Sequence, residues 1–399
     1  MKNVLVLGGG KVGKSVAELF LACGKGAYRV TLADREAANL HEAELNIQRL
    51  RGLVNHPVEF ATKEIDASDR KAVRALLKEH DYVVCMLPFN LVAGLAADAN
   101  ELGVHYFDVT EDVETTDQVK EVAKNAKVAL VPQCGLAPGY IAIAAYDIAR
   151  HFSILHNLTL RVGALSQYPT NDLKYNVTWS AAGVINEYCE PCDVMLDGKF
   201  VKVPALEGLE RFSFEGVEYE AFYTSGGVGT LVDTLIGEKK TIDETNIAYK
   251  TIRYPGHRDL MKFLLQDLRL GVEHAQATRS GRTFDRACAV DLMEHALART
   301  LQDVVVVFIN AIGIKDGRRE QVNFRRSVRA TEMFGRVWPA IELTTAAGVC
   351  AMVDLHRTGK IPAKGFVRQE EVSLADFNAT PFGLGYEAPE TIESAVLNV

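Results

Sequence analysis

The sequence predicts an α/β protein whose N-terminal part is a doubly wound parallel sheet and whose second part is an α+β domain with a mixed or antiparallel sheet. Three observations carry this prediction. Short apolar runs alternate with helical stretches over the first 135 residues, and a glycine-rich turn follows the first run. This strand–helix alternation changes after Ala137-Pro138-Gly139. Alternation of strand and helix at this spacing is typical of parallel strands joined by helical crossovers.

The elements expected in the first part follow from apolar periodicity. Strands are expected at Asn3–Leu7, Arg29–Ala33, Val58–Glu64, Tyr82–Met86, Val104–Val109 and Val128–Pro132. Helices are expected at Lys14–Cys23, Glu36–Leu50, Asp69–Glu79, Leu91–Leu102 and Thr116–Asn125. We place the first domain at residues 1–135.

The second part, residues 136–339, mixes longer strands with helices. Strands are expected at Asn157–Leu165, Phe200–Val203, Val304–Ile312 and Gln321–Thr331, and helices at Asp259–Leu268, Arg286–Thr300 and, in the tail, Glu342–His356. Leu196-Asp197-Gly198 and Lys315-Asp316-Gly317 carry Asp-Gly pairs, which are typical of hairpin turns.

Composition excludes several classes of protein. With 48% hydrophobic and 24% charged residues and a net charge of −8, the chain is neither disordered nor a basic nucleic-acid or membrane-surface binder. No apolar run is long enough to cross a membrane, and Val4–Leu7 already resembles a buried strand rather than a signal peptide. Seven cysteines, an odd number, argue against a disulfide framework, and we expect a cytoplasmic protein. The single Cys189-Glu190-Pro191-Cys192 lacks a second ligand pair, so no metal is expected.

The segment Gly8-Gly9-Gly10-Lys11-Val12-Gly13 fits the dinucleotide pattern of a Rossmann domain directly after the first strand. Gly8 permits the tight turn, Gly10 lets a pyrophosphate approach the backbone, and Gly13 allows close packing of helix on strand. The N–H groups that start the helix, at Lys11 and Val12, then face the anion. We expect a nicotinamide dinucleotide here.

Two neighbouring residues bear on the choice of coenzyme. Asp34 ends the second strand, where a carboxylate can bind the adenosine ribose hydroxyls and repel a 2′-phosphate, which favours NAD. Arg35 follows it and can pair with that phosphate, so NADP stays possible.

Two further segments are expected to contact the coenzyme. Leu87 and Pro88 follow the fourth strand at its carboxyl end, where ligands of open sheets collect. Gly135 and Pro138 fix the exit from the last strand, so that this end of the sheet can face the nicotinamide.

Three other residues are candidates for chemistry. Arg253 offers a planar fork for a carboxylate, and His257 can exchange a proton near neutral pH. The alternative is that Tyr249–His257 is an exposed strand with solvated charges. Asp108 ends the fifth strand, a good place for a site, or else it caps the next helix.

Taken in order, five segments resemble the saccharopine dehydrogenase family and, within it, the lysine 6-dehydrogenase branch. They are Gly8–Gly13, Gly135–Gly139, Leu173–Asn176 with Trp179-Ser180 and Gly183, Glu220–Phe222 with Thr224–Gly227, and Lys250–Tyr254 with Gly256-His257. The resemblance implies a Rossmann domain and a second domain that supplies substrate contacts and a homodimer interface. It also implies that the C-terminal region, about 340–399, packs back on the first domain.

Two departures from the pattern bear on the substrate. Glutamate-forming saccharopine reductases usually carry Asp where this chain has Ala137, and Arg where it has Ala181-Ala182. Loss of a cation would remove a charge-assisted bond of about 1.5–3 kcal/mol to a multiply carboxylated substrate. The departures therefore favour lysine or another small amino acid with an amine, with saccharopine dehydrogenase of either direction and a carboxynorspermidine-type reductase as alternatives.

The reaction that the resemblance implies is oxidation of a carbon–nitrogen bond with NAD or NADP. His257 or Tyr175 would transfer the proton, Arg253 would bind the substrate carboxylate, and Lys174 and Asp108 are further candidates. If His257 transfers the proton, its loss should remove a limb of the pH–rate profile near neutrality. An alternative from another class is a non-catalytic NAD-sensing protein.

Overall fold

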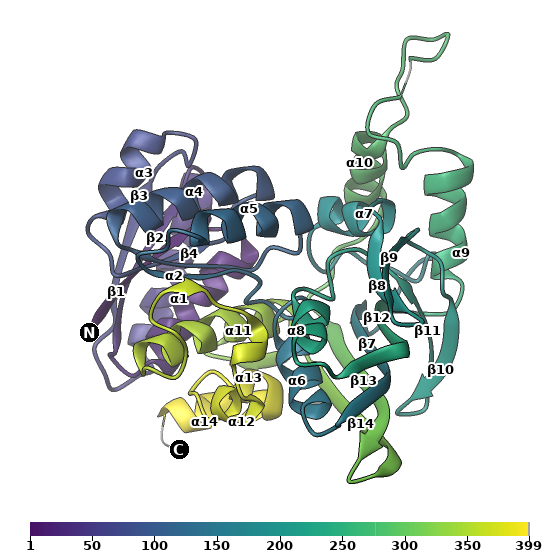
Figure 1. Cartoon of the computed structure of the whole chain (residues 1–399). Coiled ribbons are helices and arrows are strands. Elements are labelled where there is room, and N and C mark those ends of the chain that lie inside the picture. Colours follow the sequence, from purple (N-terminus) through teal and green to yellow (C-terminus); the bar gives the residue numbers. More distant parts are fainter. Residues whose placement is uncertain (276, 398–399) are drawn as a thin grey trace. The chain divides into compact units, whose positions relative to one another are not determined.

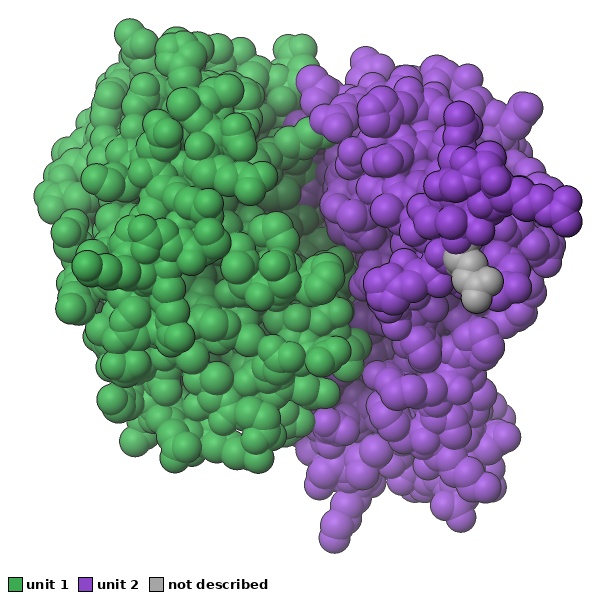
Figure 2. All heavy atoms as spheres, turned by 90° about the horizontal axis from the view of Figure 1, so that it is seen from above, with its two compact units in different colours: residues 1–147, 331–338, 342–399 green, residues 148–330, 339–341 purple. Residues whose placement is uncertain are grey.

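The computed structural model describes residues 1–275 and 277–397 (Figure 1). The chain divides into two compact units, coloured separately in Figure 2. Unit 1 contains residues 1–147, 331–338 and 342–399, and unit 2 contains residues 148–330 and 339–341. Unit 1 thus runs past the expected boundary at 135, because the N-terminal part of the next helix clusters with it, and it includes the C-terminal region.

Unit 1 begins with the alternating elements that the sequence predicts. Its strands are β1 (Lys2–Leu7), β2 (Tyr28–Asp34), β3 (Glu59–Glu64), β4 (Tyr82–Cys85), β5 (His105–Asp108) and β6 (Ala129–Val131). Its helices are α1 (Lys11–Cys23), α2 (Ala37–Arg51), α3 (Arg70–Leu77), α4 (Phe89–Leu102), α5 (Val113–Ala123) and α6 (Tyr140–Ala149), of which α6 crosses the division.

The C-terminal part adds further elements to unit 1. They are β15 (Thr331–Met333), β16 (Arg336–Trp338), α11 (Ala340–Arg357), β17 (Gly365–Phe366), α12 (Leu374–Asn378), α13 (Leu384–Glu387) and α14 (Ile392–Leu397), with 3-10 turns η2 (Gln369–Glu371) and η3 (Pro389–Thr391). The tail is therefore more helical than its Gly- and Pro-containing sequence suggests.

The sheet of unit 1 has seven parallel strands in the order β17-β6-β5-β4-β1-β2-β3. Helices α3, α4 and α5 share one apolar core against one face. Helices α1, α2 and α11 lie on the other face (Figure 1). The strand order reverses between β1 and β4, which is where ligands bind in doubly wound sheets. The predicted fold class is confirmed.

Helix α11 joins the N-terminal elements through specific contacts. Tyr28 of β2 donates to the Asp354 carboxylate at 2.5 Å, and Arg357 binds the same carboxylate at 2.8 Å. A Cβ atom at Gly348 would lie 2.6 Å from the Cys134 carbonyl oxygen, so glycine lets α11 pass close to the chain that leaves β6.

Unit 2 is built on longer strands. They are β7 (Ile154–Ser166), β8 (Cys192–Leu196), β9 (Lys199–Val203), β10 (Glu210–Phe214), β11 (Val217–Tyr223), β12 (Thr241–Arg253), β13 (Asp303–Lys315) and β14 (Arg318–Arg329). Its helices are α7 (Ala181–Cys189), α8 (Leu231–Gly237), α9 (His257–Lys262), the π-helix η1 (Phe263–Asp267) and α10 (Arg286–Ala296).

The sheet of unit 2 has eight strands, with the order β10-β11-β12-β7-β13-β14 and the β8–β9 hairpin branching from β12. Only β12 and β7 pair in parallel, so the sheet is mixed, as predicted. Both predicted hairpin turns are confirmed, because Asp197 and Gly198, and likewise Asp316 and Gly317, have positive φ angles.

Some expectations for unit 2 are wrong. Tyr249–Arg253 is not an exposed strand, because β12 lies inside the sheet between β11 and β7. The expected helix Asp259–Leu268 begins at His257 and changes into a π-helix at Phe263. Strands β8, β10 and β11 were not predicted, because they are short and lie close to hairpin turns. In the part of the chain that is described, no helix has both the length and the apolar character that a membrane crossing requires.

Candidate functional site

The glycine turn of unit 1 is shaped by contacts that leave no room for side chains. Gly8 has φ +103°, and a Cβ atom there would lie 2.5 Å from the Met86 carbonyl oxygen. A Cβ atom at Gly13 would lie 1.9 Å from the carbonyl oxygen of Gly8. By contrast, a Cβ atom at Gly10 would meet nothing within 4 Å, so this face of the turn is open to a ligand.

The start of helix α1 is suited to an anion. Gly10 is the residue before the helix, and no side chain caps the first turn. The N–H groups at Lys11, Val12 and Gly13 have no acceptor within the helix and point toward the space beside Gly10. The residues present therefore fit the pyrophosphate of a dinucleotide.

The Asp34 carboxylate, which is expected to bind the ribose, holds the glycine turn. One oxygen accepts from the Gly9 N–H at 2.5 Å and the other from the Glu36 N–H at 2.7 Å. Arg35 is exposed and, within the described part of the chain, its ion-pair partner is the exposed Glu36 at 3.2 Å. An exposed pair of this kind is weak, so the guanidinium is free to bind a phosphate.

The other expected coenzyme contacts lie at the same edge of the sheet. Leu87 and Pro88 follow β4, whose extension is bonded to β1 through the Met86 N–H and the Leu7 carbonyl at 2.7 Å. Pro88 immediately precedes helix α4. Gly135 and Pro138 lie in the turn after β6, where the Cys134 N–H donates to the Asp108 carbonyl at 2.7 Å.

Asp108 is buried at the carboxyl end of β5 and has three donors. Its carboxylate accepts from the Tyr106 hydroxyl, the Thr110 N–H and the Gln133 N–H at 2.9 to 3.0 Å. Burial raises the pKa of Asp108 to about 6, although these bonds lower it. The alternative that Asp108 caps the next helix is wrong, because Asp112 accepts from the Thr115 N–H at 2.8 Å.

Sequence reasoning missed Glu111, in the turn between Asp108 and Asp112. Its side chain is partly buried and has no ion-pair partner among the described residues. Burial raises the pKa of Glu111, and the charges of Asp112 and Asp108 add to this effect. A raised pKa makes the carboxylate a stronger base, which suits a role in proton transfer. A third acidic residue in one turn was the only signal in the sequence.

In unit 2 the structure brings Arg253, His257 and Tyr175 together. Arg253 ends β12 and is only 2% exposed. Its Nε donates to the Tyr188 hydroxyl at 2.8 Å and its Nη1 to the Ile252 carbonyl at 2.9 Å. Among the described residues, the guanidinium forms no ion pair with a carboxylate. The negative charge of Glu187 does act on Arg253 and helps to raise its pKa. A buried cation without a directly paired anion is still costly, so this site is suited to an anionic group from a ligand.

The hydrogen bonds of His257 fix its protonation state. Its Nδ1 lies 2.9 Å from the Leu173 carbonyl and must donate to it, because a carbonyl only accepts. Its Nε2 therefore accepts from the Tyr188 hydroxyl, at 3.0 Å. Burial and the nearby charge of Arg253 lower the pKa of His257 to about 3. The expectation of proton exchange near neutral pH is wrong for this reason.

Tyr188, in helix α7, connects the two residues, and the sequence analysis missed it. Its hydroxyl accepts from Arg253 and donates to His257, so it fixes the orientation of both. Glu220 of β11 adds support, because its carboxylate accepts from the Gly256 and Arg258 N–H groups at 2.9 and 2.7 Å. No motif distinguishes Tyr188 from a core aromatic residue in the sequence.

Tyr175 lies beside the same cluster. The Arg253 Cζ lies 5.4 Å from the centre of its ring, and the His257 ring lies 5.5 Å from it. Its buried hydroxyl has no hydrogen-bond partner among the described residues. Burial raises the pKa of Tyr175, so the phenol is neutral. Lys174 is exposed and donates to the Pro255 carbonyl at 2.8 Å, which fixes the loop before His257.

The doubly wound sheet and its uncapped glycine turn define the class of protein: it has a unit suited to bind a dinucleotide, joined to a mixed-sheet unit. Comparison with known families is more specific. Residues 4–131 match the saccharopine dehydrogenase NADP binding domain, and residues 135–382 match the saccharopine dehydrogenase C-terminal domain. The chain belongs to the saccharopine dehydrogenase family, as its motifs indicated, and its coenzyme is NAD or NADP.

Individual relatives are distant. The chain is 23% identical to a saccharopine dehydrogenase [NADP(+), L-glutamate-forming] of Pyricularia oryzae over 275 residues, which are 66% of this chain and 57% of that protein. It is 24% identical to the mitochondrial alpha-aminoadipic semialdehyde synthase of Mus musculus over 209 residues, 51% of this chain and 21% of that protein. The aligned part is thus little more than half of the first relative and about a fifth of the second.

A solved structure shares the fold. The apo saccharopine dehydrogenase (L-Glu forming) of Saccharomyces cerevisiae superposes with a TM-score of 0.74 at 16% identity. The superposition covers 96% of each chain.

Proposed function

We propose that this protein is an NAD(P)-dependent dehydrogenase that oxidises the CH–NH bond of a small amino acid, with the side-chain amine of L-lysine as the first candidate. The observation that carries the proposal is Arg253, a buried guanidinium without an anionic partner among the described residues of its unit. A substrate with one α-carboxylate supplies a directly paired anion.

Arg253 is held ready for this role by its neighbours. Two of its donor groups are bonded to Tyr188 and Ile252, whereas Nη2 has no acceptor among the described residues. A charge-assisted bond from this fixed guanidinium to a carboxylate contributes about 1.5–3 kcal/mol. Tyr188 and, through it, His257 are positioning residues, since they set the guanidinium in place.

The bound NAD(P) supplies the hydride acceptor. The chain must supply a group that takes a proton from the ammonium of the substrate, since only the neutral amine has a lone pair to stabilise the imine as hydride leaves the adjacent carbon. Water then releases ammonia and the aldehyde. Glu111 is our candidate proton acceptor, because burial raises its pKa. The Tyr175 hydroxyl is poorly suited to accept this proton, because burial raises its pKa and keeps the phenol neutral.

Asp34 and Arg35 bear on the choice between coenzymes, and we propose NAD as the better one. The Asp34 carboxylate faces the ribose position and would repel a 2′-phosphate. We expect Asp34→Ala to weaken NAD binding more than NADP binding, measured as the ratio of the two Kd values. A larger loss for NADP would contradict this choice.

Saccharopine is the second candidate substrate, and the names of the relatives favour it. Against it, Arg253 provides one carboxylate anchor, whereas saccharopine carries more than one carboxylate. The experiment is a panel of lysine, saccharopine, ornithine and pentane-1,5-diamine, each tested with NAD and NADP by absorbance at 340 nm.

Pentane-1,5-diamine is the sharpest member of the panel, because it is lysine without the carboxylate. The proposal expects turnover of lysine with a much lower KM than for the diamine, and Arg253→Met should remove this difference. If saccharopine were the one compound of the panel to be oxidised, saccharopine and not lysine would be the substrate. Coenzyme binding without turnover of any amine would contradict an enzyme and favour an NAD sensor.

We propose a homodimer that forms through the sheet of unit 2. One face of this sheet carries partly exposed aromatic and charged side chains, among them Phe212 and Phe308 around Arg161, which pairs with Glu210. Sedimentation equilibrium should give twice the chain mass for the wild type and the single mass for Phe308→Glu. A monomeric wild type would contradict the proposal.

We also propose a reducing, cytoplasmic location. All seven cysteines lie in the described residues, and none forms a disulfide. Fractionation of cells that express the tagged chain tests this.

A further inference from the structure

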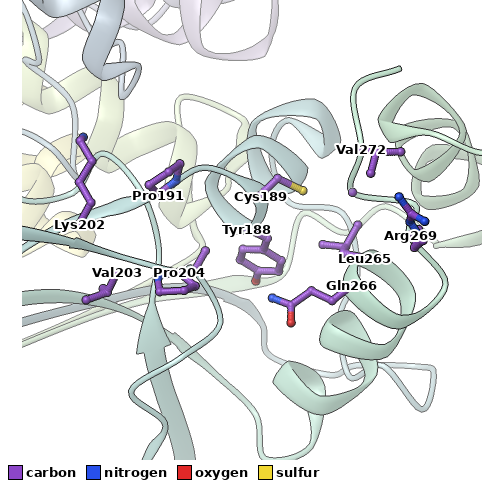
Figure 3. A pocket seen from close by; sticks show the side chains of 12 residues that line it. Tyr188, Cys189, Pro191, Lys202, Val203, Pro204, Leu265, Gln266, Arg269 and Val272 are labelled. Atoms are coloured by element: carbon purple, nitrogen blue, oxygen red, sulfur yellow. The ribbon is translucent and has the colours of Figure 1, made fainter. Parts of the chain in front are cut away.

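Unit 2 contains a cavity that the proposed reaction does not use. Its volume is about 560 Å³, which is in the range of small-molecule sites. It lies between the end of helix α7, strand β9 with the segment after it, and the π-helix η1 with the loop that follows (Figure 3). Most of its wall is apolar and consists of Pro191, Val203, Pro204, Ala205, Leu265 and Val272.

The wall at η1 has an unusual backbone. Leu265 and Gln266 belong to a π-helix, a rare conformation that is frequent at functional sites. Arg269 follows with φ +60°, a left-handed conformation that side chains other than glycine seldom adopt. Gly271 then packs so closely that a Cβ atom would lie 3.1 Å from the Cys189 sulfur.

This strained loop is anchored at several points. The Gly271 N–H donates to the Leu265 carbonyl at 2.9 Å. Arg286 donates to the Gly271 carbonyl at 2.8 Å and pairs with Glu190, at the end of α7, at 2.6 Å. The surrounding structure therefore maintains the conformation that brings Arg269 to the cavity.

The charges at the cavity differ in their availability. Lys202 pairs with Asp193 at 2.8 Å, but its side chain is 62% exposed, so this ion pair is weak. Arg269, by contrast, is exposed and has no ion-pair or hydrogen-bond partner for its guanidinium among the described residues. An apolar cavity with an unpaired cation at its wall is suited to a ligand with an apolar body and one negative charge.

We propose that this cavity binds a small organic anion, an aliphatic monocarboxylate, with its chain against Leu265 and Val203 and its carboxylate on Arg269. The cavity is not lined by Arg253 or His257, but Tyr188 belongs both to its wall and to the Arg253 cluster. The side chain of Tyr188 lines the cavity (Figure 3), while its hydroxyl holds Arg253 and His257. Occupation of the cavity is therefore expected to change the KM of the amine substrate.

The test is calorimetric titration of the full chain with hexanoate, with hexan-1-ol and hexylammonium as probes of the same length. Hexanoate should bind at least tenfold more tightly than either, a difference of about 1.4 kcal/mol. Arg269→Gln should remove this preference and leave basal turnover unchanged. Arg318→Gln, at an exposed position of the β13–β14 hairpin, is the matched control and should bind hexanoate as the wild type does.

Three results would overturn the proposal: no heat from hexanoate, equal affinity for hexanoate and hexan-1-ol, or equal losses in both arginine variants. Displacement of hexanoate by the amine substrate would show that the cavity is part of the substrate site. The claim that the two sites are distinct would then be wrong. Hexanoate binding without a change in KM would overturn the link through Tyr188. Because the titration needs no turnover, it can succeed even if no amine is oxidised.

Discussion

The two candidate binding regions of this protein are built in opposite ways. The glycine turn of unit 1 is made of the backbone of consecutive residues, Gly8–Gly13. The Asp34 carboxylate, at the end of the next strand, holds it. The Arg253 cluster of unit 2 is made of side chains from β12, α7, α9 and the loop before α7. A site made of backbone is visible as a motif, whereas a site made of distant side chains is visible only after folding.

The largest expected effect is at Gly13. Gly13→Ala places a Cβ atom 1.9 Å from a backbone oxygen that cannot move aside, so we expect a loss of about 3 kcal/mol in the free energy of unfolding. NAD(P) binding should weaken more than 100-fold. Thermal unfolding and calorimetric titration measure the two effects.

Gly94→Ala is the matched control, because Gly94 lies in helix α4 and a Cβ atom there meets nothing within 4 Å. This variant should stabilise the protein by about 0.5–1 kcal/mol. If both variants bind NAD(P) like the wild type, the glycine turn is not the dinucleotide site.

The next effect separates function from stability in the Arg253 cluster. Arg253→Met should raise the KM for the carboxylate-bearing substrate about 10- to 100-fold, because the lost bond contributes about 1.5–3 kcal/mol. The melting temperature should change little, because the lost hydrogen bonds to Tyr188 and Ile252 are offset by removal of a buried charge that has no directly paired anion among the described residues. Steady-state kinetics and calorimetry measure both. An unchanged KM would reject the anchoring role.

A smaller effect distinguishes the two buried tyrosines. Tyr188→Phe leaves the Arg253 Nε and the His257 Nε2 without their partner and should destabilise the protein by about 1–3 kcal/mol. Tyr175→Phe removes a hydroxyl without a partner among the described residues and should leave stability unchanged. Denaturant unfolding compares them, and equal losses would contradict the proposed network.

The smallest effect is on the pH dependence of stability. The pKa of His257 is lowered to about 3 in the folded protein, so below the ordinary value of 6.5 the unfolded chain binds the proton and the folded one does not. The contribution of His257 to stability should therefore fall by about 1.4 kcal/mol per pH unit as the pH drops below 6.5.

Urea unfolding at several pH values measures this slope. His257→Gln should reduce it, whereas His41→Gln, at an exposed position of α2, should not. A wild-type slope in both variants would show that His257 does not cause it. The pH–rate profile of turnover should show no limb near neutral pH that is due to His257.

The fold of unit 1 could be predicted because its signals are local. Apolar runs such as Val4–Leu7 and the glycine turn each determine one element, and the crossover rule then orders them. The fold of unit 2 was harder to predict, because β10 and β11 are short and β12 has polar residues at its start. Their pairing depends on partners far away in the sequence.

The candidate site divides in the same way. Arg253, His257 and Tyr175 could be chosen from their chemistry, but Tyr188 and Glu111 could not, since nothing near them marks them as different from a core tyrosine or a surface acid. The role of His257 also changed, because complete burial beside a guanidinium lowers its pKa far below neutrality.

The sequence by itself determined the coenzyme turn and the family, because glycine spacing and strand–helix alternation act through the neighbouring backbone. Only the tertiary structure decided which groups are buried, which charges lack partners and which hydroxyl connects Arg253 to His257. The physical reason is that hydrogen bonding, ion pairing and desolvation depend on distances between groups, and these distances exist only in the folded chain.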